Sequence, residues 1–580
     1  MKSLFFLLLT VTAAVAAPPN IVFIITDDQG YGDLAAHGNP AVETPHLDRL
    51  RAQSLTLTDY HVAPTCSPSR ASLLTGQWSN RTGVWHTIGS RSILSGQKTS
   101  IATLLKQAGY ATGLFGKWHL GDHFPSRPQD HGFQEVYAHL GGGVGQTPDA
   151  WDNGYFNDTY QHNGREVISE GFCTDVFFQQ ATRWISQCAQ QKKPFFAYIS
   201  TNAPHTPLHC PQKYLDLYPD LSPHLAAFYG MISNIDERTG DLRQFLDQHG
   251  LTENTLFIFT TDNGTAGDRN FYNAGMSGGK GSALEGGHRV PFFLHWPKGG
   301  FSQLRPVDSL THAVDVLPTL LDLCSVKPPE GLQLDGVNFL NLPPESDRIL
   351  ITDSQRLQQP VKWRRTAVMQ RKWRLIDGKQ LFHLTQDPLQ KENLASRFPE
   401  KVAELTRFYE QWWEELSPGF AQEARIPIGP AQNSPLSLTA HDWIQDHEPA
   451  WNQRQIRAAL AGSGGYWALQ VLQPGSYQIE LRRWPASLDH PINASLASGP
   501  PVTGPEPAFR TRFGEALSVG KATVTLNGRS LPAASVNPTD RAVTFTTTLE
   551  EGPLDLKATF ISPDGQTKTG AYYVTLKKAP

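Results

Sequence analysis

The sequence predicts an α/β fold: a mostly parallel central sheet flanked by helices, then a small α+β C-terminal unit and an added all-β domain. Three observations support this. From residue 20 to about 345, short apolar runs alternate with helical stretches. Two strand-like runs and one amphipathic helix follow, over 346–420. Beyond residue 456, short alternating strands follow turn signals without a helical stretch.

The apolar runs in the first region are typical of strands buried on both faces. They lie at 20–25, 110–115, 195–200 and 256–259. The helical stretches between them lie at 44–54, 99–107, 175–190 and 225–249. This alternation favours a parallel sheet with helices on both faces, in which ligands bind beyond the carboxyl ends of the strands. We therefore expect a catalytic domain over 17–345.

The small unit and the segment after it have clear turn and helix signals. Runs at 367–376 and 380–384 flank the turn dipeptide Asp377-Gly378. Residues 399–416 form an amphipathic helix in which Trp412 belongs to the core. Several prolines then predict a linker over 421–455.

The last domain, over 456–580, is expected to be a sandwich or jelly roll. Residues 466–473 and 476–481 meet across Pro474-Gly475, which predicts a hairpin. Further strand-like runs lie at 522–526, 542–548, 556–560 and 572–576. Such a domain binds carbohydrate, covers the catalytic domain or mediates assembly, and the sequence leaves all three open.

The N-terminal residues and the net charge indicate where the protein is located and which class of partner it does not bind. Residues 1–16 carry Lys2, an apolar run and small residues, which predicts a secretory signal peptide. The run is too short to span a bilayer, so we expect a secreted or periplasmic protein without a membrane anchor. The net charge of −4 argues against a nucleic-acid partner. Of the five cysteines, the four besides Cys66 form two disulfides or stay reduced.

Acidic and amide side chains follow two of the predicted strands. Asp27 and Asp28 come after the first strand, and Asp262 and Asn263 follow the strand at 256–259. Each aspartate alone is also a common turn former. Together they offer only oxygen ligands, which favours Ca²⁺, with Mg²⁺ as the alternative, and disfavours zinc.

Cationic side chains are predicted at the same edge. Lys117, His119 and His205 follow strands, and Lys280 lies in a glycine-rich stretch that would let a ligand approach the backbone. A lone lysine is usually solvated and a lone histidine structural. With a metal beside them, however, these groups suit a tetrahedral oxyanion ester.

The segment Cys66-Ser-Pro-Ser-Arg70 is unusual because a cysteine opens a predicted helix. Pro68 suits the first helical turn. The thiol would feel the positive end of the helix dipole, with Arg70 one turn on. This predicts a nucleophile or an anion site, and the alternative is a half-buried free cysteine.

Cys66-Ser-Pro-Ser-Arg70, continued by Ala-Ser-Leu-Leu-Thr-Gly76, resembles the signature of the type I sulfatases, arylsulfatase-like and formylglycine-dependent members of the alkaline phosphatase superfamily. In that family the cysteine is oxidised to formylglycine, whose hydrate attacks sulfur. The resemblance covers roughly residues 20 to 420. Its eight motifs lie in the family's order at 26–33, 44–50, 66–76, 116–121, 131–133, 203–207, 261–264 and 285–291.

The resemblance implies an alkaline phosphatase-like fold and a role for each site residue. The metal ligands would be Asp27, Asp28, Asp262, Asn263 and the residue made from Cys66. Arg70 would hold the formylglycine, and Lys117 and Lys280 would bind sulfate oxygens. His119 would accept the proton that lets sulfate leave, and His205 would contact the ester oxygen and protonate the leaving alkoxide. A formylglycine-generating enzyme is an implied partner.

One stretch departs from the family pattern. Some arylsulfatases have a serine that contacts sulfate shortly after His-Gly-Phe, but residues 138–145 hold none. His139 is a possible substitute. The triple glycine at 141–143 predicts a flexible or closely approaching loop.

Loops after the strand ends supply candidate substrate-binding residues. They are Trp85, His123 and Trp151, together with His288 from the last motif. Aromatic rings beside acids and amides suit sugar recognition, whereas core packing is the alternative for the tryptophans.

The sequence therefore predicts a secreted sulfatase that hydrolyses a sulfate ester on a sulfated carbohydrate. One alternative is a phosphonate or phosphate monoester hydrolase of the same superfamily, since one cation-rich site serves either ester. The other is a non-catalytic glycan-binding protein, which would have no need of the Cys66 signature.

Overall fold

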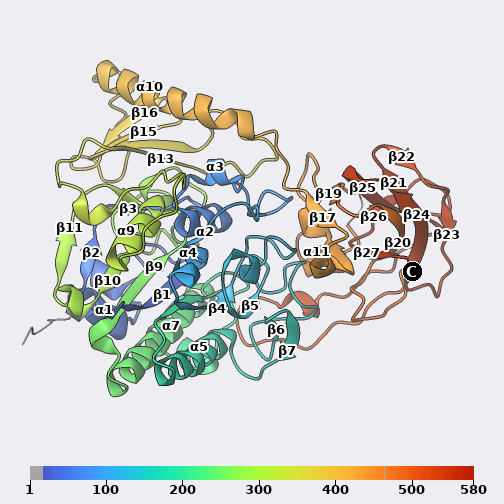
Figure 1. Ribbon diagram of the computed structural model, residues 1–580, viewed down its shortest axis with the longest axis horizontal. Coiled ribbons are helices and arrows are strands. Elements are labelled where there is room, and N and C mark those ends of the chain that lie inside the picture. Colours follow the sequence, from blue (N-terminus) through green and yellow to red (C-terminus); the bar gives the residue numbers. More distant parts are fainter. Residues whose placement is uncertain (1–16, 461, 463, 580) are drawn as a thin grey trace, which may run out of the picture.

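The computed structural model describes residues 17–460, 462 and 464–579 (Figure 1). The predicted signal peptide, residues 1–16, lies outside the described residues. Across the described chain, no helix is both long enough and apolar enough to span a membrane.

A ten-stranded sheet forms the centre of the larger part of the molecule, in the order β11-β2-β10-β9-β1-β8-β4-β5-β6-β7. Its five middle strands are parallel to one another. They are β9 (Thr255–Thr261), β1 (Asn20–Thr26), β8 (Phe195–Ser200), β4 (Ala111–Lys117) and β5 (Glu135–His139). The outer strands are β11 (Arg305–Val307), β2 (Leu55–Leu57), β10 (Phe292–His295), β6 (Thr159–His162) and β7 (Arg165–Ile168). The predicted mostly parallel sheet is confirmed.

Helices cover both faces of this sheet (Figure 1). One face packs against α1 (Pro45–Ala52), α5 (Cys173–Gln190) and α7 (Pro223–Gln248), and the other against α2 (Cys66–Thr75), α4 (Ile101–Gln107) and α9 (Val316–Leu323). Because successive strand side chains point to opposite faces, Val22 and Ile24 join the first core and Phe23 and Ile25 the second. Both faces are therefore apolar, as the continuous strand runs predict.

Short elements complete this part of the chain. They are β3 (Tyr60–His61), β12 (Thr311–His312), α3 (Ser79–Thr82), α6 (Gln212–Leu215) and α8 (Glu285–His288). All five cysteines are buried and unbridged.

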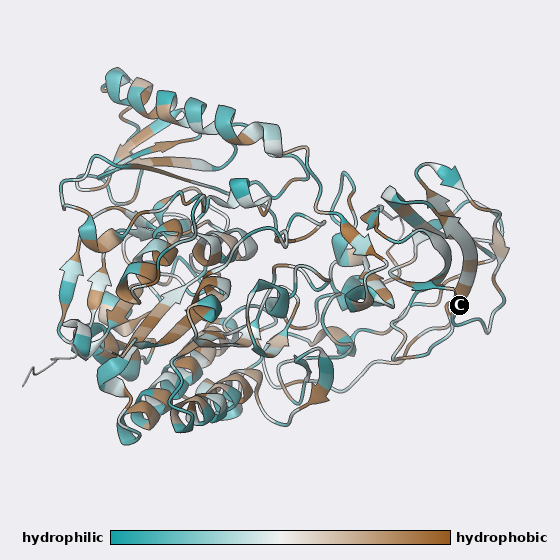
Figure 2. Cartoon of the chain, viewed as in Figure 1, coloured by the Kyte–Doolittle hydropathy of each residue, from teal (hydrophilic) through white to brown (hydrophobic). Residues whose placement is uncertain are grey.

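The small unit is a four-stranded antiparallel sheet with one helix on it. Its elements are β13 (Ile349–Asp353), β14 (Thr366–Gln370), β15 (Trp373–Ile376), β16 (Gln380–His383) and α10 (Pro399–Leu416). The expected turn joins β15 to β16, with φ of 50° at Asp377 and 67° at Gly378. Trp412 lies in the core, as expected, and the outer face of α10 is hydrophilic (Figure 2).

Two sheets that share one core form the C-terminal part, which confirms an all-β sandwich. The first contains β17 (Ile426–Ile428), β19 (Trp467–Val471), β25 (Gly552–Ile561), β21 (Lys521–Leu526), β22 (Arg529–Ser530), β23 (Ala534–Ser535) and β26 (Lys568–Gly570). The second contains β18 (Leu436–Thr439), β27 (Tyr573–Lys578), β20 (Gly475–Arg482) and β24 (Val543–Leu549). One short helix, α11 (Gln453–Arg457), lies beside them.

Two expectations for this region are corrected. The stretches around Pro474-Gly475 do not form a hairpin, because β19 and β20 lie in different sheets; Gly475, with φ of 142°, begins β20. The predicted linker over 421–455 contains β17 and β18, which pair with β19 and β27. Its prolines are compatible with strands because Pro427 lies in an edge strand and Pro435 precedes one.

Candidate active site

Acidic residues from separate strands meet at the carboxyl edge of the parallel sheet. Asp27 and Asp28 lie at the end of β1, Asp262 follows β9, and Cys66 is the first residue of α2. One ligand atom from each of these four residues lies within 4.8 Å of every other. The structure therefore brings these sequence-predicted residues together, and all four are buried.

The donor set fits a hard divalent cation. Asp27 Oδ1 and Asn263 Oδ1 are buried without a hydrogen-bond partner, although buried polar atoms are normally paired. Asn263 uses its amide nitrogen instead, donating to Asp28 Oδ1 at 2.9 Å. Oxygens left free beside further carboxylates are the ligands that Ca²⁺ and Mg²⁺ prefer.

Each carboxylate of the cluster is paired with one cation. Lys117 Nζ lies 2.5 Å from Asp27 Oδ2, and Lys280 Nζ lies 2.6 Å from Asp28 Oδ1. Asp262 Oδ2 accepts hydrogen bonds from Nε and Nη2 of Arg70 at 2.9 and 2.8 Å. The three cations therefore line the acidic cluster.

Two of these carboxylates have shifted pKa values in opposite directions. Burial raises the pKa of Asp28, but Lys280 and His205 outweigh it and hold the pKa below its ordinary value. Burial and the neighbouring Asp27 raise the pKa of Asp262 to about 6, in spite of Arg70. A cation between these carboxylates would relieve their repulsion.

The Cys66 thiol is not activated in the way the sequence suggested. Burial and Asp27 raise its pKa to about 12, and Lys117 and Lys280 offset this only in part. Arg70, one helical turn on, pairs with Asp262 at 2.8 Å. At neutral pH the thiol is therefore protonated, and a strong nucleophile at this position requires a different chemical group.

Two histidines flank the cluster in their neutral forms. Burial and Lys117 lower the pKa of His119 well below its ordinary value, and burial and Lys280 lower that of His205 to about 3. His119 Nε2 donates to the Thr87 carbonyl at 2.8 Å, so its buried, unpartnered Nδ1 keeps a lone pair. His205 Nε2 lies 3.8 Å from Asp28 Oδ2.

The triple-glycine loop packs against both histidines, which confirms the expected close approach. A Cβ on Gly142 would lie 2.3 Å from His119 Cε1, and one on Gly143 would lie 3.0 Å from His205 Cε1. His139, the suggested substitute for the missing serine, does not line the pocket. It stacks on Tyr160 at 4.6 Å, and Gln146 lines the pocket instead.

A cavity of about 650 Å³ opens above these residues. Cys66, His119, His205 and Lys280 lie in its lining. The rest of the wall includes residues 86–88, 356–359, 445–449 and 451. Sequence reasoning missed the lining residues from 356 onwards, because loops from different domains meet only in the tertiary structure and carry no periodic signal.

The four sequence-predicted substrate-binding residues lie outside this lining. Trp85 is buried and donates to the Leu357 carbonyl at 3.1 Å. Trp151 packs against Trp484 of the β sandwich at 5.7 Å. His123 lies 3.2 Å from Asp122 and 3.5 Å from Asp442. For both tryptophans the structure favours packing, the alternative.

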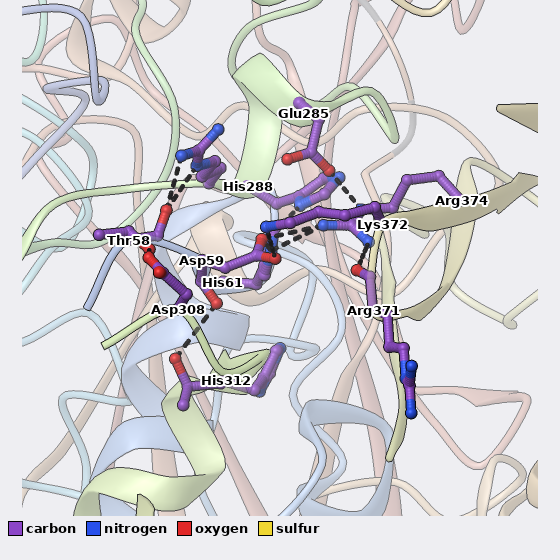
Figure 3. A network of polar contacts seen from close by, with 12 residues as sticks. Thr58, Asp59, His61, Glu285, His288, Asp308, His312, Arg371, Lys372 and Arg374 are labelled. Carbon is purple, nitrogen blue, oxygen red and sulfur yellow. Dashed lines mark hydrogen bonds and ion pairs between the residues drawn. The ribbon is translucent and has the colours of Figure 1, made fainter. Parts of the chain in front are cut away.

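His288 belongs to a buried polar network that joins the small unit to the central sheet (Figure 3). Arg374 of β15 contacts Glu285 Oε1 at 2.6 Å and Asp59 Oδ1 at 2.9 Å. His61 Nδ1 lies 2.8 Å from His288 Nδ1. The motif at 285–291 therefore connects the small unit to the central sheet. His288 contributes to that connection and does not face the pocket.

Comparison with known proteins agrees with this geometry. Residues 19–326 match the family model described as Sulfatase. N-acetylgalactosamine-6-sulfatase of Mus musculus is 32% identical over 355 residues, which cover 57% of this chain and 66% of that relative, slightly less than two thirds. Arylsulfatase J of Mus musculus is 28% identical over 467 residues, which cover 69% of this chain and 76% of the relative.

Solved structures show the same fold. Ps i-CgsB in complex with k-i-k-neocarrahexaose is 28% identical, with a TM-score of 0.62 over 68% of this chain and 93% of that one. PsFucS1 sulfatase from Pseudoalteromonas sp. is 23% identical, with a TM-score of 0.59 over 69% of this chain and 91% of that one, a likeness of fold alone. Because the family match spans more than half of the sequence and includes every residue of the acidic cluster, the chain belongs to the sulfatase family.

Proposed function

We propose that this protein hydrolyses a sulfate ester on a sulfated carbohydrate, using a formylglycine made from Cys66 and a bound Ca²⁺. One observation carries the proposal: four ligand atoms within 4.8 Å of one another lie beside Lys117, Lys280 and Arg70. Such a site suits a small tetrahedral anion. A relative named for N-acetylgalactosamine 6-sulfate and a structure holding a neocarrahexaose support a carbohydrate substrate.

Asp27, Asp28, Asp262 and Asn263 would hold the metal, which polarises a sulfate oxygen when bound. Oxygen-only donors favour Ca²⁺, with Mg²⁺ as the alternative. The aldehyde hydrate at position 66 supplies the attacking hydroxyl. This role agrees with the raised pKa of the unmodified thiol, which leaves the thiol a poor nucleophile.

The two lysines would stabilise charge on the sulfate oxygens. Lys117 and Lys280 are each fixed by a carboxylate, at 2.5 and 2.6 Å, so little reorganisation is needed when substrate binds. Arg70 is fixed in the same way by Asp262. Charge that develops during sulfuryl transfer thus meets donors already in place.

The two histidines would handle the protons. The unpartnered Nδ1 of His119 is a lone-pair acceptor close to the loop at Gly142. A bound sulfate, being negative, favours the protonated form of His205, whose Nε2–H would donate to the leaving oxygen. Overall, an S–O bond to the attacking hydroxyl would form as the ester S–O bond breaks, and the alcohol oxygen would gain a proton. That hydroxyl's oxygen would leave with sulfate, and water would rehydrate the aldehyde at position 66.

We also propose that the protein is secreted or periplasmic and is matured by a formylglycine-generating enzyme, as the signal-like N-terminus and the Cys66 signature suggest. The domains would be a catalytic part at 17–345, a small unit at 346–420 and a β domain that begins near residue 421, because β17 and β18 join its sheets.

Parallel assays of the matured protein with the sulfate and phosphate esters of one phenol test the activity. We expect the sulfate ester to turn over faster. Faster hydrolysis of the phosphate or a phosphonate ester would favour the alternative hydrolase. Tight saccharide binding without any turnover would instead indicate a glycan-binding protein. Release of sulfate from a panel of defined sulfated saccharides would then identify the sugar and the sulfated position.

A further inference from the structure

We infer that the pocket has a second anion-binding position, formed by the loop between β13 and β14 and centred on Arg356. Its ligand is a second negative group, a sulfate ester or a carboxylate, on a sugar unit adjacent to the one that loses sulfate. This inference rests on the proposed function and specifies its substrate class: a saccharide with at least two anionic groups.

The loop brings its arginines next to the proposed sulfate-binding lysine. Arg356 lines the same cavity as Lys280 and Cys66. A Cβ on Gly281, the residue after Lys280, would lie 3.8 Å from Arg356 Cζ and 3.9 Å from Arg365 Nη1. The second position therefore lies in the same cavity as the first and beside the residue that follows Lys280.

These arginines have no carboxylate partner. In the described parts of the chain, no acidic oxygen lies within 4.0 Å of Arg356, Arg364 or Arg365, whereas Lys362 of the same loop pairs with Glu410. Arg356 Nε is also buried without a hydrogen-bond partner. Guanidinium groups present a planar fork of donors that matches sulfate and carboxylate. The unused donors of Arg356 therefore call for an anionic ligand.

The loop holds these groups in a fixed conformation. Arg356, Trp363 and Arg365 have φ of 45°, 61° and 44°, which non-glycine residues seldom adopt. Trp363 stacks on Tyr409 of α10 at 3.7 Å, and its backbone N–H donates to the Tyr409 hydroxyl. Because the loop is already ordered in this way, it loses little conformational entropy when a ligand binds.

Another part of the wall differs in charge. Residues 445–449 and 451 contribute Asp446 and Glu448 but no lysine or arginine. Gln358 and Gln445 each bury a side-chain oxygen without a partner, which suits donation by sugar hydroxyls. The charge distribution thus favours an anionic substituent at Arg356 over one at Asp446 and Glu448, while the amide oxygens of Gln358 and Gln445 can accept hydrogen bonds from neutral hydroxyls.

Calorimetric binding to the full-length Cys66→Ala protein with Ca²⁺ tests this inference, because the ligands then bind without turnover. Three saccharides of equal length are compared: one with a single sulfate, one with a second sulfate on the neighbouring unit, and one with a carboxylate there. We expect at least one of the two dianionic saccharides to bind about tenfold tighter than the monosulfated one. That gain should shrink as NaCl is raised.

Adding Arg356→Gln should remove the gain, and Arg356→Lys should retain part of it because the charge remains without the fork. Lys362→Gln is the matched control: it removes a charge from the same loop at a side chain that pairs with Glu410, and it should keep the full gain.

Equal affinity for all three saccharides, no binding of either dianionic saccharide, or an undiminished gain in Arg356→Gln would overturn the inference. The saccharide that shows the gain identifies the second group as sulfate or carboxylate. Sulfate release by matured protein is measured separately, so a failure of the proposed function is distinguishable from a failure of this subsite.

Discussion

At the scale of single residues, the unpartnered oxygens of Asp27 and Asn263 are the most informative feature of the site. Burying a polar atom without a partner costs about 1–3 kcal/mol. Both atoms belong to the acidic cluster, whose charges a cation would balance. A metal bound between them would coordinate both oxygens and so offset the cost of burying them without a hydrogen-bond partner.

The metal prediction follows from this cluster. Asp27→Ala and Asp262→Ala should each abolish stoichiometric Ca²⁺ binding and lower sulfatase turnover by about 10³-fold or more, because a ligand and its charge are lost together. Metal content of the purified protein and calcium titration calorimetry provide the measurement.

Asp353→Asn is the control for this prediction, since Asp353 is a buried acid whose pKa burial raises to about 6 and which lies outside the cluster. It should bind Ca²⁺ like the parent. Stoichiometric zinc in active protein, or unchanged calcium binding by Asp262→Ala, would contradict the assignment.

The glycine loop gives a second prediction at this scale. Gly142→Ala places a methyl group 2.3 Å from His119 Cε1, so the imidazole must move. A displacement of about 1 Å at a reacting group can cost about 100-fold in rate. We expect a fall in kcat of about that size, with the thermal midpoint little changed.

The neighbouring Gly141→Ala is its control, because the nearest atom to the new methyl lies 3.7 Å away. Its kcat should stay within a factor of about two of the parent. Equal kcat values for the two variants would show that the loop does not position His119.

At the scale of elements, the hydrophobic pattern predicted strands and helices well where the pattern of burial is the same along the whole element. β8 and α10 have the predicted bounds, and the helices around the central sheet begin and end within a few residues of the prediction. The prediction that β19 and β20 form a hairpin was wrong. Alternation of apolar and polar residues shows which face of a strand is buried but not which strand it pairs with. The pattern also failed at β17 and β18, because prolines at sheet edges resemble prolines in a linker.

The junction between the catalytic part and the β sandwich contains a buried ion pair, His123 with Asp442, at 3.5 Å. Burial lowers the pKa of His123, but Asp122 and Asp442 outweigh it and raise the pKa above its ordinary 6.5. Burial raises the pKa of Asp442, but His123 and His441 outweigh it and lower the pKa below its ordinary 3.8. Each group thus favours the charged form of the other.

The sign of the pH dependence follows from these shifts. The contribution of Asp442 is present above pH 3.8 and is lost as pH falls through its lowered pKa. That of His123 is complete below pH 6.5 and is lost as pH rises through its raised pKa. The pair therefore stabilises the junction most between about pH 4 and 6.5.

Asp442→Asn should destabilise the protein by about 2 kcal/mol at pH 6, because it removes one of the two carboxylates that balance the buried His123 imidazolium and leaves only Asp122. Chemical denaturation at pH 6 and pH 9 should show this difference shrinking at the higher pH. The exposed Glu551→Gln serves as control and should change stability little at either pH. An Asp442→Asn effect that is equal at pH 6 and pH 9 would contradict the charged pair.

At the scale of the whole molecule, the sequence located the base of the site but not its walls. Asp27, Lys117, His205 and Asp262 were predicted together because the carboxyl ends of parallel strands meet at one edge. Burial was not predictable from spacing, and burial is what makes the Cys66 thiol inert and places Trp85 in the core. The walls at 356–359, 445–449 and 451 come from the small unit and the β domain, whose positions only the tertiary structure gives.

The central claim is that residue 66 acts as a modified cysteine. Mass spectrometry of the tryptic peptide that ends at Arg70, combined with turnover of a sulfate ester by the same sample, tests it most directly. We predict that active protein contains a peptide lighter than the encoded one, because an aldehyde replaces the thiol, and that Cys66→Ala is folded but inactive. Full activity in a sample whose peptide retains unmodified cysteine would contradict the account.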